Sequence, residues 1–194
     1  MVIALNLALC MAMDGQRVVV VDCDLRRPTQ HRHFPALSNE RGVSTVLSHA
    51  CTLEEALQSV ALHQGTGALS VLTAGPLPQN PGPLLESLRL RQVLQELARS
   101  FDVVIVDAPP VLAVSDPLAL ARASRGTLVV LEAGATTRRM VADLRHRLEA
   151  GGVTPLGVVV NKVDVRSGGY GYYRAYKELY AGKSTTRAAA GGEA

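Results

Sequence analysis

The sequence is organised around residues 18–28, which read VVVVDCDLRRP. Four consecutive valines bounded by charged residues predict a strand that is buried on both faces. The strand ends at Asp22, and Asp24 follows two residues later. Because open parallel sheets bind ligands beyond the carboxyl ends of their strands, we expect Asp22 and Asp24 to face a ligand.

The charges at this strand end favour a binding site over a solvated turn. Two carboxylates this close repel each other unless a cation or a bound substrate separates them. Arg26 and Arg27 follow directly and could neutralise part of this negative charge, or the charge of a bound phosphate. A strand-to-loop turn with solvated acids is the alternative, and the D-x-D-x-R spacing after a buried strand makes it the less favoured one.

Length and composition describe one ordinary globular domain. The chain has 194 residues, of which 47% are hydrophobic, and its net charge of +3 gives no argument for a nucleic-acid partner. Cys10, Cys23 and Cys51 lack metal-ligand spacing and fit buried thiols in a reducing cytoplasm. The longest apolar run, 2–13, is too short to span a bilayer.

Predicted helices and strands alternate along the rest of the chain. The helices are expected at 2–13, 53–60, 83–100, from Ser115, and at 140–150. The further strands are expected at 69–73, 101–107, 127–132 and 156–160. This alternation predicts the α/β class with a mostly parallel sheet.

A second predicted strand also ends in a carboxylate, at Asp107, and is followed by Ala108-Pro109-Pro110. A strand that ends in a single aspartate is a weak signal. Its combination with Asp22 and Asp24 is stronger, because Mg²⁺ prefers one or two carboxylates together with waters and phosphate oxygens.

These two strand ends resemble the Walker A′ and Walker B motifs of the bacterial tyrosine kinases, or BY-kinases. The BY-kinases are P-loop proteins related to MinD- and ParA-type ATPases. The two aspartate motifs are common to both groups, whereas the R-R-P of residues 26–28 resembles the kinases. The resemblance covers about 2–180. It implies a three-layer α/β/α sandwich of P-loop NTPase type with a mostly parallel sheet.

The phosphate-binding segment of the family has no counterpart in this sequence. In the family, G-x-G-K-S/T-T precedes an apolar helix containing N-L-A; here 6–8 read NLA, and Met1 stands where that turn should end. We therefore expect the first strand and the P-loop to be missing, and the missing strand to lie between the strands that end at Asp22 and Asp107. Residues 182–185, GKST, resemble the end of such a loop, but Lys177 stands where the motif needs Gly.

The composition changes after residue 165, so we expect a kinase-like domain at 1–165 and a flexible tail at 166–194. Ser167-Gly168-Gly169 has the composition of a flexible joint. All five tyrosines of the chain follow it: Tyr170, Tyr172, Tyr173, Tyr176 and Tyr180. A tyrosine cluster at the C-terminus resembles the phosphorylation target of the BY-kinases.

The resemblance also implies roles for individual residues. The reaction would be transfer of the ATP γ-phosphoryl group to tyrosine hydroxyls, mainly on a neighbouring subunit. Asp22 and Asp107 would support Mg²⁺, and Asp24 would orient or deprotonate the acceptor hydroxyl. Arg26 would steady the loop or contact phosphate. Asn161 is expected near the nucleotide base. Its N-K-x-D segment also occurs in GTPases, but so short a motif does not identify the nucleotide as GTP.

The biological setting implied by the resemblance is regulation of capsular or exopolysaccharide polymerisation and export. The expected partners are a membrane polysaccharide co-polymerase, further copies of the chain and protein tyrosine substrates, with no nucleic acid. The expected location is cytoplasmic, at the inner face of the plasma membrane through that partner. The chain would be a separate subunit or the end of a larger protein.

Two other classes of function remain open at this point. The chain could be a non-catalytic scaffold or regulatory remnant of such a kinase, which the missing P-loop favours. It could also be a ParA/MinD-like positioning ATPase, which the tyrosine cluster disfavours.

Overall fold

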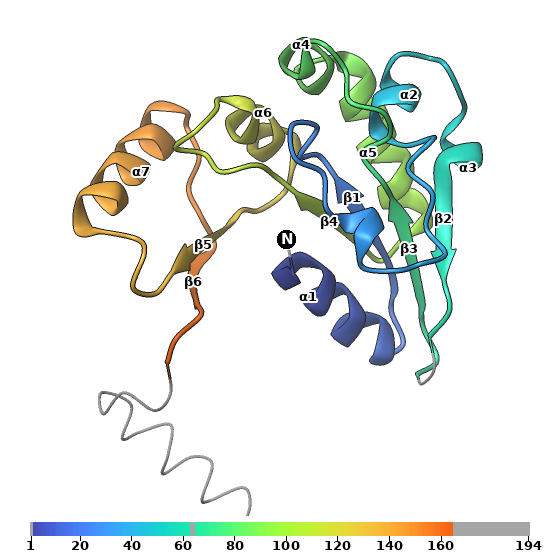
Figure 1. Ribbon diagram of the computed structural model, residues 1–194, viewed down its shortest axis with the longest axis horizontal. Coiled ribbons are helices and arrows are strands. Elements are labelled where there is room, and N and C mark those ends of the chain that lie inside the picture. Colours follow the sequence, from blue (N-terminus) through green and yellow to red (C-terminus); the bar gives the residue numbers. More distant parts are fainter. Residues whose placement is uncertain (1, 63–64, 165–194) are drawn as a thin grey trace, which may run out of the picture.

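The computed structural model describes residues 2–62 and 65–164 (Figure 1). The predicted tail domain at 166–194, with all five tyrosines and the GKST segment, lies outside the described residues. The boundary expected at residue 165 therefore stays a prediction.

Helices and strands alternate over most of the described chain. The helices are α1 (Val2–Met13), the 3₁₀ helix η1 (Gln30–Arg32), α2 (Val43–Leu47), α3 (Leu53–Ala56), α4 (Pro81–Leu85), α5 (Leu88–Ser100), α6 (Asp116–Ala123) and α7 (Arg138–Ala150). The strands are β1 (Arg17–Asp22), β2 (Leu57–Val60), β3 (Ala68–Leu72), β4 (Val103–Asp107), β5 (Leu128–Glu132) and β6 (Gly157–Asn161). None of the described helices has the length and apolar character that a membrane-spanning segment needs.

The strands form a four-stranded sheet in the order β2-β3-β1-β4 and a separate pair, β5-β6 (Figure 1). Strand β1 runs parallel to β3 and β4, and β5 runs parallel to β6, whereas β2 is antiparallel to β3. The expectation of an α/β fold with a mostly parallel sheet is confirmed.

The expected position of the missing strand is wrong, because β1 pairs directly with β4. Val18 lies opposite Val103, and the register continues to Asp22 opposite Asp107. Both strands are runs of β-branched residues that end in an aspartate, so nothing in either run indicates which strand is its neighbour. Within the described chain, β4 is bonded only to β1 and β5 only to β6, so each has one edge without a strand partner.

The alternating side chains of β1 build the layers on either side of the four-stranded sheet. Val18 and Val20 pack with the buried residues of α1, and Val19 and Val21 pack with those of α5. All four valines are 0% exposed, as expected for a central strand covered on both faces. The layers α1, sheet and α5 agree with the expected sandwich.

Apolar side chains remain exposed on α1 and on the β5-β6 pair. Helix α1 is apolar apart from Asn6, yet Met13 is 49% exposed and Leu7 40%. On the pair, Leu128, Val158 and Val160 are 50 to 56% exposed. A helix that is apolar on every side is normally buried, so these surfaces fit a sheet that takes a further element.

Two predicted helices differ from the structure. The helix expected at 53–60 stops at Ala56, because Leu57–Val60 pairs with β3 as β2, although the predicted cap is present: Glu55 N–H donates to Thr52 Oγ1 over 3.2 Å. The helix expected at 83–100 is two helices, because the extended Ser87 starts α5 and its hydroxyl oxygen accepts the Leu90 N–H. Of the cysteines expected to be buried, Cys23 is buried, Cys51 is half-buried and Cys10 is exposed.

The packing of α5 against the sheet gives a direct prediction about stability. Leu97→Ala should lower the free energy of unfolding by about 2 to 5 kcal/mol, because Leu97 is 1% exposed and its loss leaves a cavity. Leu88→Ala on the same helix is the control, since Leu88 is 74% exposed and should change stability by under about 0.5 kcal/mol. Urea unfolding followed by circular dichroism measures both, and equal effects would contradict the packing described here.

Candidate active site

The pairing of β1 with β4 brings two aspartates together at the carboxyl edge of the sheet. Asp22 and Asp107 are opposite each other in the register and are 0% and 5% exposed. The Cys23 N–H donates to the Asp107 carbonyl over 2.9 Å, which continues the ladder past the strand ends. Two carboxylates are therefore held side by side in a site that is nearly closed to water.

The loop after β1 folds back around the Asp22 carboxylate. Its Oδ1 accepts the backbone N–H of Asp24 over 3.2 Å. Its Oδ2 accepts the N–H groups of Thr29 and Gln30 over 3.2 and 3.1 Å. Backbone N–H groups that converge in this way form a nest for negative charge. Asp22 therefore organises the loop as well as marking the strand end.

Burial dominates the protonation of Asp22. The pKa of Asp22 is raised from 3.8 to about 6, mainly by burial and also by the charge of Asp107, although the N–H groups of Gln30, Asp24 and Thr29 lower it. Removal of the carboxylate from water outweighs the bonds from the loop. A positive group between the two aspartates would relieve this cost.

Asp24 and Arg26 lie in the same loop but have different partners. Asp24 is half-buried, and its Oδ1 accepts the backbone N–H groups of Arg26 and Arg27 over 3.3 and 2.9 Å. The Arg26 guanidinium donates to the Asp116 carboxylate, from Nε to Oδ2 over 2.8 Å and from Nη2 to Oδ1 over 3.3 Å. Of the two roles expected for Arg26, this contact supports steadying the loop.

Asp116 and Gln30 are site residues that the sequence analysis missed. Asp116 is 3% exposed at the start of α6 and is separated from Arg26 by 90 residues. Gln30 is 1% exposed, and its Nε2 donates to Asp107 Oδ2 over 2.5 Å. Their partners, Arg26 for Asp116 and Asp107 for Gln30, are far away in the sequence, so no local motif could have indicated these two residues. The one available signal would have been a polar residue in an otherwise apolar stretch.

Asn161 lies at the end of β6, in the separate two-stranded sheet. It is opposite Glu132 in the register, and its carbonyl accepts the Ala133 N–H over 2.9 Å. The next residue, Lys162, has a left-handed backbone with φ of 56°, and its Nζ lies 2.8 Å from Glu132 Oε1. The contact of Asn161 with a nucleotide base therefore stays a prediction.

The residues at the strand ends fit Mg²⁺ as part of a shared site. Asp22 and Asp107 supply carboxylate oxygens, and Mg²⁺ commonly takes one or two carboxylates and completes its shell with waters and phosphate oxygens. The part of the chain that the structure describes holds no group of three or more His, Cys, Asp or Glu side chains that could hold a metal ion alone. Waters and phosphate oxygens would complete the coordination.

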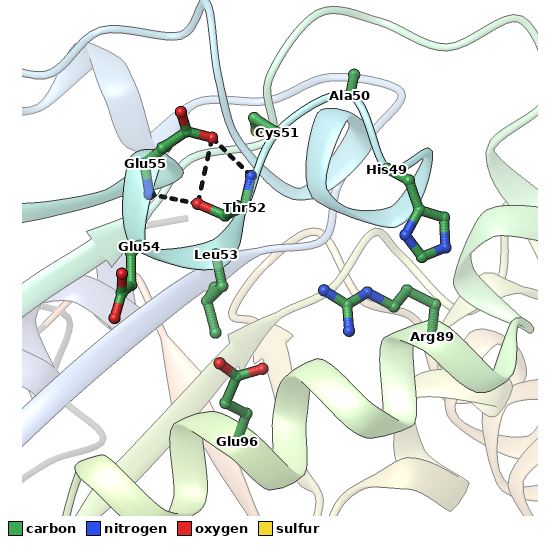
Figure 2. A pocket seen from close by; sticks show the side chains of 9 residues that line it. All are labelled: His49, Ala50, Cys51, Thr52, Leu53, Glu54, Glu55, Arg89 and Glu96. Carbon is green, nitrogen blue, oxygen red and sulfur yellow. Dashed lines mark hydrogen bonds between the residues drawn. The ribbon is translucent and has the colours of Figure 1, made fainter.

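A pocket of about 500 Å³ lies elsewhere, between the segment 49–55 and α5 (Figure 2). Figure 2 shows Arg89 on α5 beside His49, and Glu96 on the same helix facing Leu53. Behind Leu53 lies the capping box of α3, where Thr52 N–H donates to Glu55 Oε2 over 2.8 Å. Its lining mixes basic and acidic side chains and includes none of the aspartates at the strand ends. The pocket is therefore separate from the candidate active site.

Comparison with known proteins agrees with this arrangement. A family profile described as an AAA domain matches residues 2–150. The tyrosine-protein kinase YwqD of Bacillus subtilis strain 168 is 36% identical over 171 residues, which cover 88% of this chain and 70% of YwqD. The chain belongs to the bacterial tyrosine-protein kinases.

Other members of this kinase family are longer proteins. Tyrosine-protein kinase etk of Escherichia coli strain K12 is 38% identical over 162 residues, which are 84% of this chain but 22% of etk. The solved kinase domain of E. coli ETK has a TM-score of 0.77 at 38% identity and covers 85% of this chain and 63% of that domain.

A more distant structure shares the fold alone. The septum site-determining protein MinD from Pyrococcus horikoshii OT3, complexed with Mg-ADP, has a TM-score of 0.64 at 16% identity and covers 91% of this chain and 70% of that chain. The expected relation to MinD-type ATPases is confirmed at the level of the fold.

The raised pKa of Asp22 predicts an unusual dependence of stability on pH. The folded-state pKa of about 6 lies above the ordinary 3.8, so Asp22 is protonated in the folded protein at a higher pH than in the unfolded chain. Protonation of Asp22 therefore raises the free energy of unfolding as pH falls from about 6 to about 4. The gain is up to about 3 kcal/mol at 1.36 kcal/mol per pKa unit. Asp102 acts in the opposite direction at lower pH, since Arg17 lowers its pKa to about 2.

Urea unfolding of the chain at a series of pH values tests this prediction. Asp22→Asn is the control, and it should lose the rise in stability between neutral pH and about pH 4. A parent protein whose stability only falls on acidification would contradict the assignment.

Proposed function

We propose that this chain carries the acidic half of an ATP-dependent protein-tyrosine kinase site. The observation that carries the proposal is the direct β1–β4 pairing, which sets Asp22 opposite Asp107, with Asp24 two residues further on. Phosphoryl transfer depends on positioning and charge neutralisation more than on covalent chemistry, and carboxylates at adjacent strand ends suit that task.

Asp107 and Asp22 would hold the Mg²⁺ that accompanies ATP. Bound there, the ion would neutralise charge on the phosphates. The Asp22 carboxylate already accepts backbone N–H groups of Asp24, Thr29 and Gln30. Asp22 would then act mainly by shaping the loop and by adding negative charge beside the ion.

Asp24 would orient or deprotonate the acceptor tyrosine hydroxyl. It is half-buried, on the loop beyond the strand end. The Arg26–Asp116 contact supports this role, because it ties the loop to α6 at a point two residues from Asp24. A fixed loop keeps the carboxylate in one place, and correct geometry is the first requirement of a general base.

The phosphates of ATP need a cradle of backbone N–H groups, such as the turn before a helix supplies. In the resembling P-loop proteins this turn follows a strand and precedes an apolar helix like α1. Two observations support a strand between the two sheets. Within the described chain, β4 and β5 each have an edge without a strand partner, and α1 has exposed apolar residues. We propose this position in place of the one expected from the sequence.

The acceptors we propose are Tyr170, Tyr172, Tyr173, Tyr176 and Tyr180, phosphorylated on a neighbouring copy, together with other protein tyrosines. Asn161 would lie near the base. By resemblance the kinase would control polymerisation and export of capsular or exopolysaccharide from the inner face of the plasma membrane, bound to a membrane co-polymerase. A non-catalytic scaffold of the same machinery remains the second candidate.

A phosphotransfer experiment separates the kinase from the scaffold. The chain is preceded by a strand and a phosphate-binding loop of the family pattern G-x-G-K-S/T-T, and this extended kinase is mixed with an extended Asp24→Asn partner. ATP and Mg²⁺ are added, and phosphotyrosine is mapped on each chain. We expect phosphate on the tyrosines of the partner, while the Asp24→Asn protein alone loses about 100-fold or more in transfer rate and still binds ATP.

Asp143→Asn serves as the control, because Asp143 is an exposed aspartate on α7. It should transfer phosphate at the parent rate. Near-normal transfer by the Asp24→Asn protein would refute the role of Asp24, and phosphate found only on a kinase's own chain would refute transfer between copies.

A further inference from the structure

Gln30 touches both aspartates at the strand ends. Its backbone N–H donates to Asp22 Oδ2 over 3.1 Å, and its side-chain Nε2 donates to Asp107 Oδ2 over 2.5 Å. The residue opens the short helix η1 and is 1% exposed. One residue of the loop therefore bridges the end of β1 and the end of β4.

The chemistry of a glutamine suits this position. A long polar side chain is seldom fully buried unless it is paired, and here the amide N–H meets a carboxylate in a low-dielectric setting, where the bond is strong. An apolar residue in its place would take this donor from Asp107. A lysine would bring a permanent positive charge to the position where a metal ion is needed. A neutral donor fixes the carboxylate and leaves its negative charge in place.

The bond selects one oxygen of Asp107 and so sets the direction of the whole carboxylate. Carboxylates that ligate metals are commonly held by such a neighbouring hydrogen bond, and loss of the neighbour weakens metal binding. The Gln30 backbone fixes Asp22 at the same time, so the two carboxylates are oriented by one residue.

We propose that Gln30 is a positioning residue of the cation site, which orients Asp107 through its side-chain amide and Asp22 through its backbone. This inference rests on the proposed function, because it takes Asp22 and Asp107 to be the cation-binding pair. It goes further in assigning a role to a residue outside both aspartate motifs.

Binding of Mn²⁺ alone to the purified chain tests the proposal, with water-proton relaxation as the readout. Gln30→Met keeps the length of the side chain and removes the donor, and it should weaken Mn²⁺ binding by roughly tenfold or more. Gln30→Asn keeps an amide that is too short to reach Asp107 and should weaken binding similarly. The Asn variant keeps the test available if the Met variant does not fold.

Gln58→Met is the matched control. The Gln58 amide forms a similar clamp away from the site, since its Nε2 donates to the Ser38 carbonyl and its Oε1 accepts the Ser38 N–H, both over 2.8 Å. Loss of this clamp should leave Mn²⁺ affinity unchanged. Thermal unfolding of each variant, run in parallel, separates lost stability from lost binding.

The outcomes distinguish this inference from the proposed function. The inference is supported if the parent binds Mn²⁺, if Asp107→Asn abolishes this binding, and if both Gln30 variants weaken it. Binding by the parent that the folded Gln30 variants retain in full overturns the role of Gln30 alone. A parent that takes up no Mn²⁺ at millimolar concentration, or binding that survives Asp107→Asn, overturns the cation site itself and the inference with it.

Discussion

The pairing of β1 with β4 is the interaction on which the rest of the site depends. It places the Asp22 and Asp107 carboxylates at the same level of the sheet, where both are almost fully buried. Buried carboxylates are costly unless they are hydrogen-bonded or paired with positive charge. The loop 23–30 offsets part of the free-energy cost of burying them, because its backbone N–H groups donate to Asp22 and the Gln30 side-chain amide donates to Asp107. Arg26 then ties the same loop to Asp116 on α6.

Sequence patterns were sufficient for the central strand and for the acidic ends of β1 and β4. Their runs of β-branched residues have no helical periodicity, and each stops at an aspartate, so the strands and the position of the aspartates at their ends could be predicted from local information. The order of the strands could not, since neither run indicates its neighbour, and the missing strand was therefore misplaced. Gln30 and Asp116 were overlooked because their partners lie 77 and 90 residues away.

Long-range contacts also explain the errors in secondary structure. Leu57–Val60 continues a correctly predicted helix start, but pairing with β3 turns it into a strand. Ser87 interrupts an apolar periodicity that runs across α4 and α5, and its capping bond starts a new helix there. In both places a tertiary or capping contact outweighed the periodicity used for the prediction.

The two sheets of the described chain suggest how the proposed nucleotide site would be divided. The four-stranded sheet supplies the carboxylates at its edge, whereas Asn161, the residue proposed to lie near the base, is in the β5-β6 pair. The phosphate-binding turn would sit between them, on a strand bonded to the open edge of β4. The cation, the phosphates and the base would then each be bound by a different part of the fold.

Calorimetric titration with ATP in the presence of Mg²⁺ tests this division most directly. The 194-residue chain is compared with the same chain preceded by a strand and a phosphate-binding loop of the family pattern G-x-G-K-S/T-T, and with the Asp107→Asn variant of the extended chain. We predict tight binding by the extended chain, weak binding by the 194-residue chain, and loss of the Mg²⁺ dependence in the variant. Equally tight binding by the 194-residue chain, or a variant that keeps its full Mg²⁺ dependence, would contradict the account.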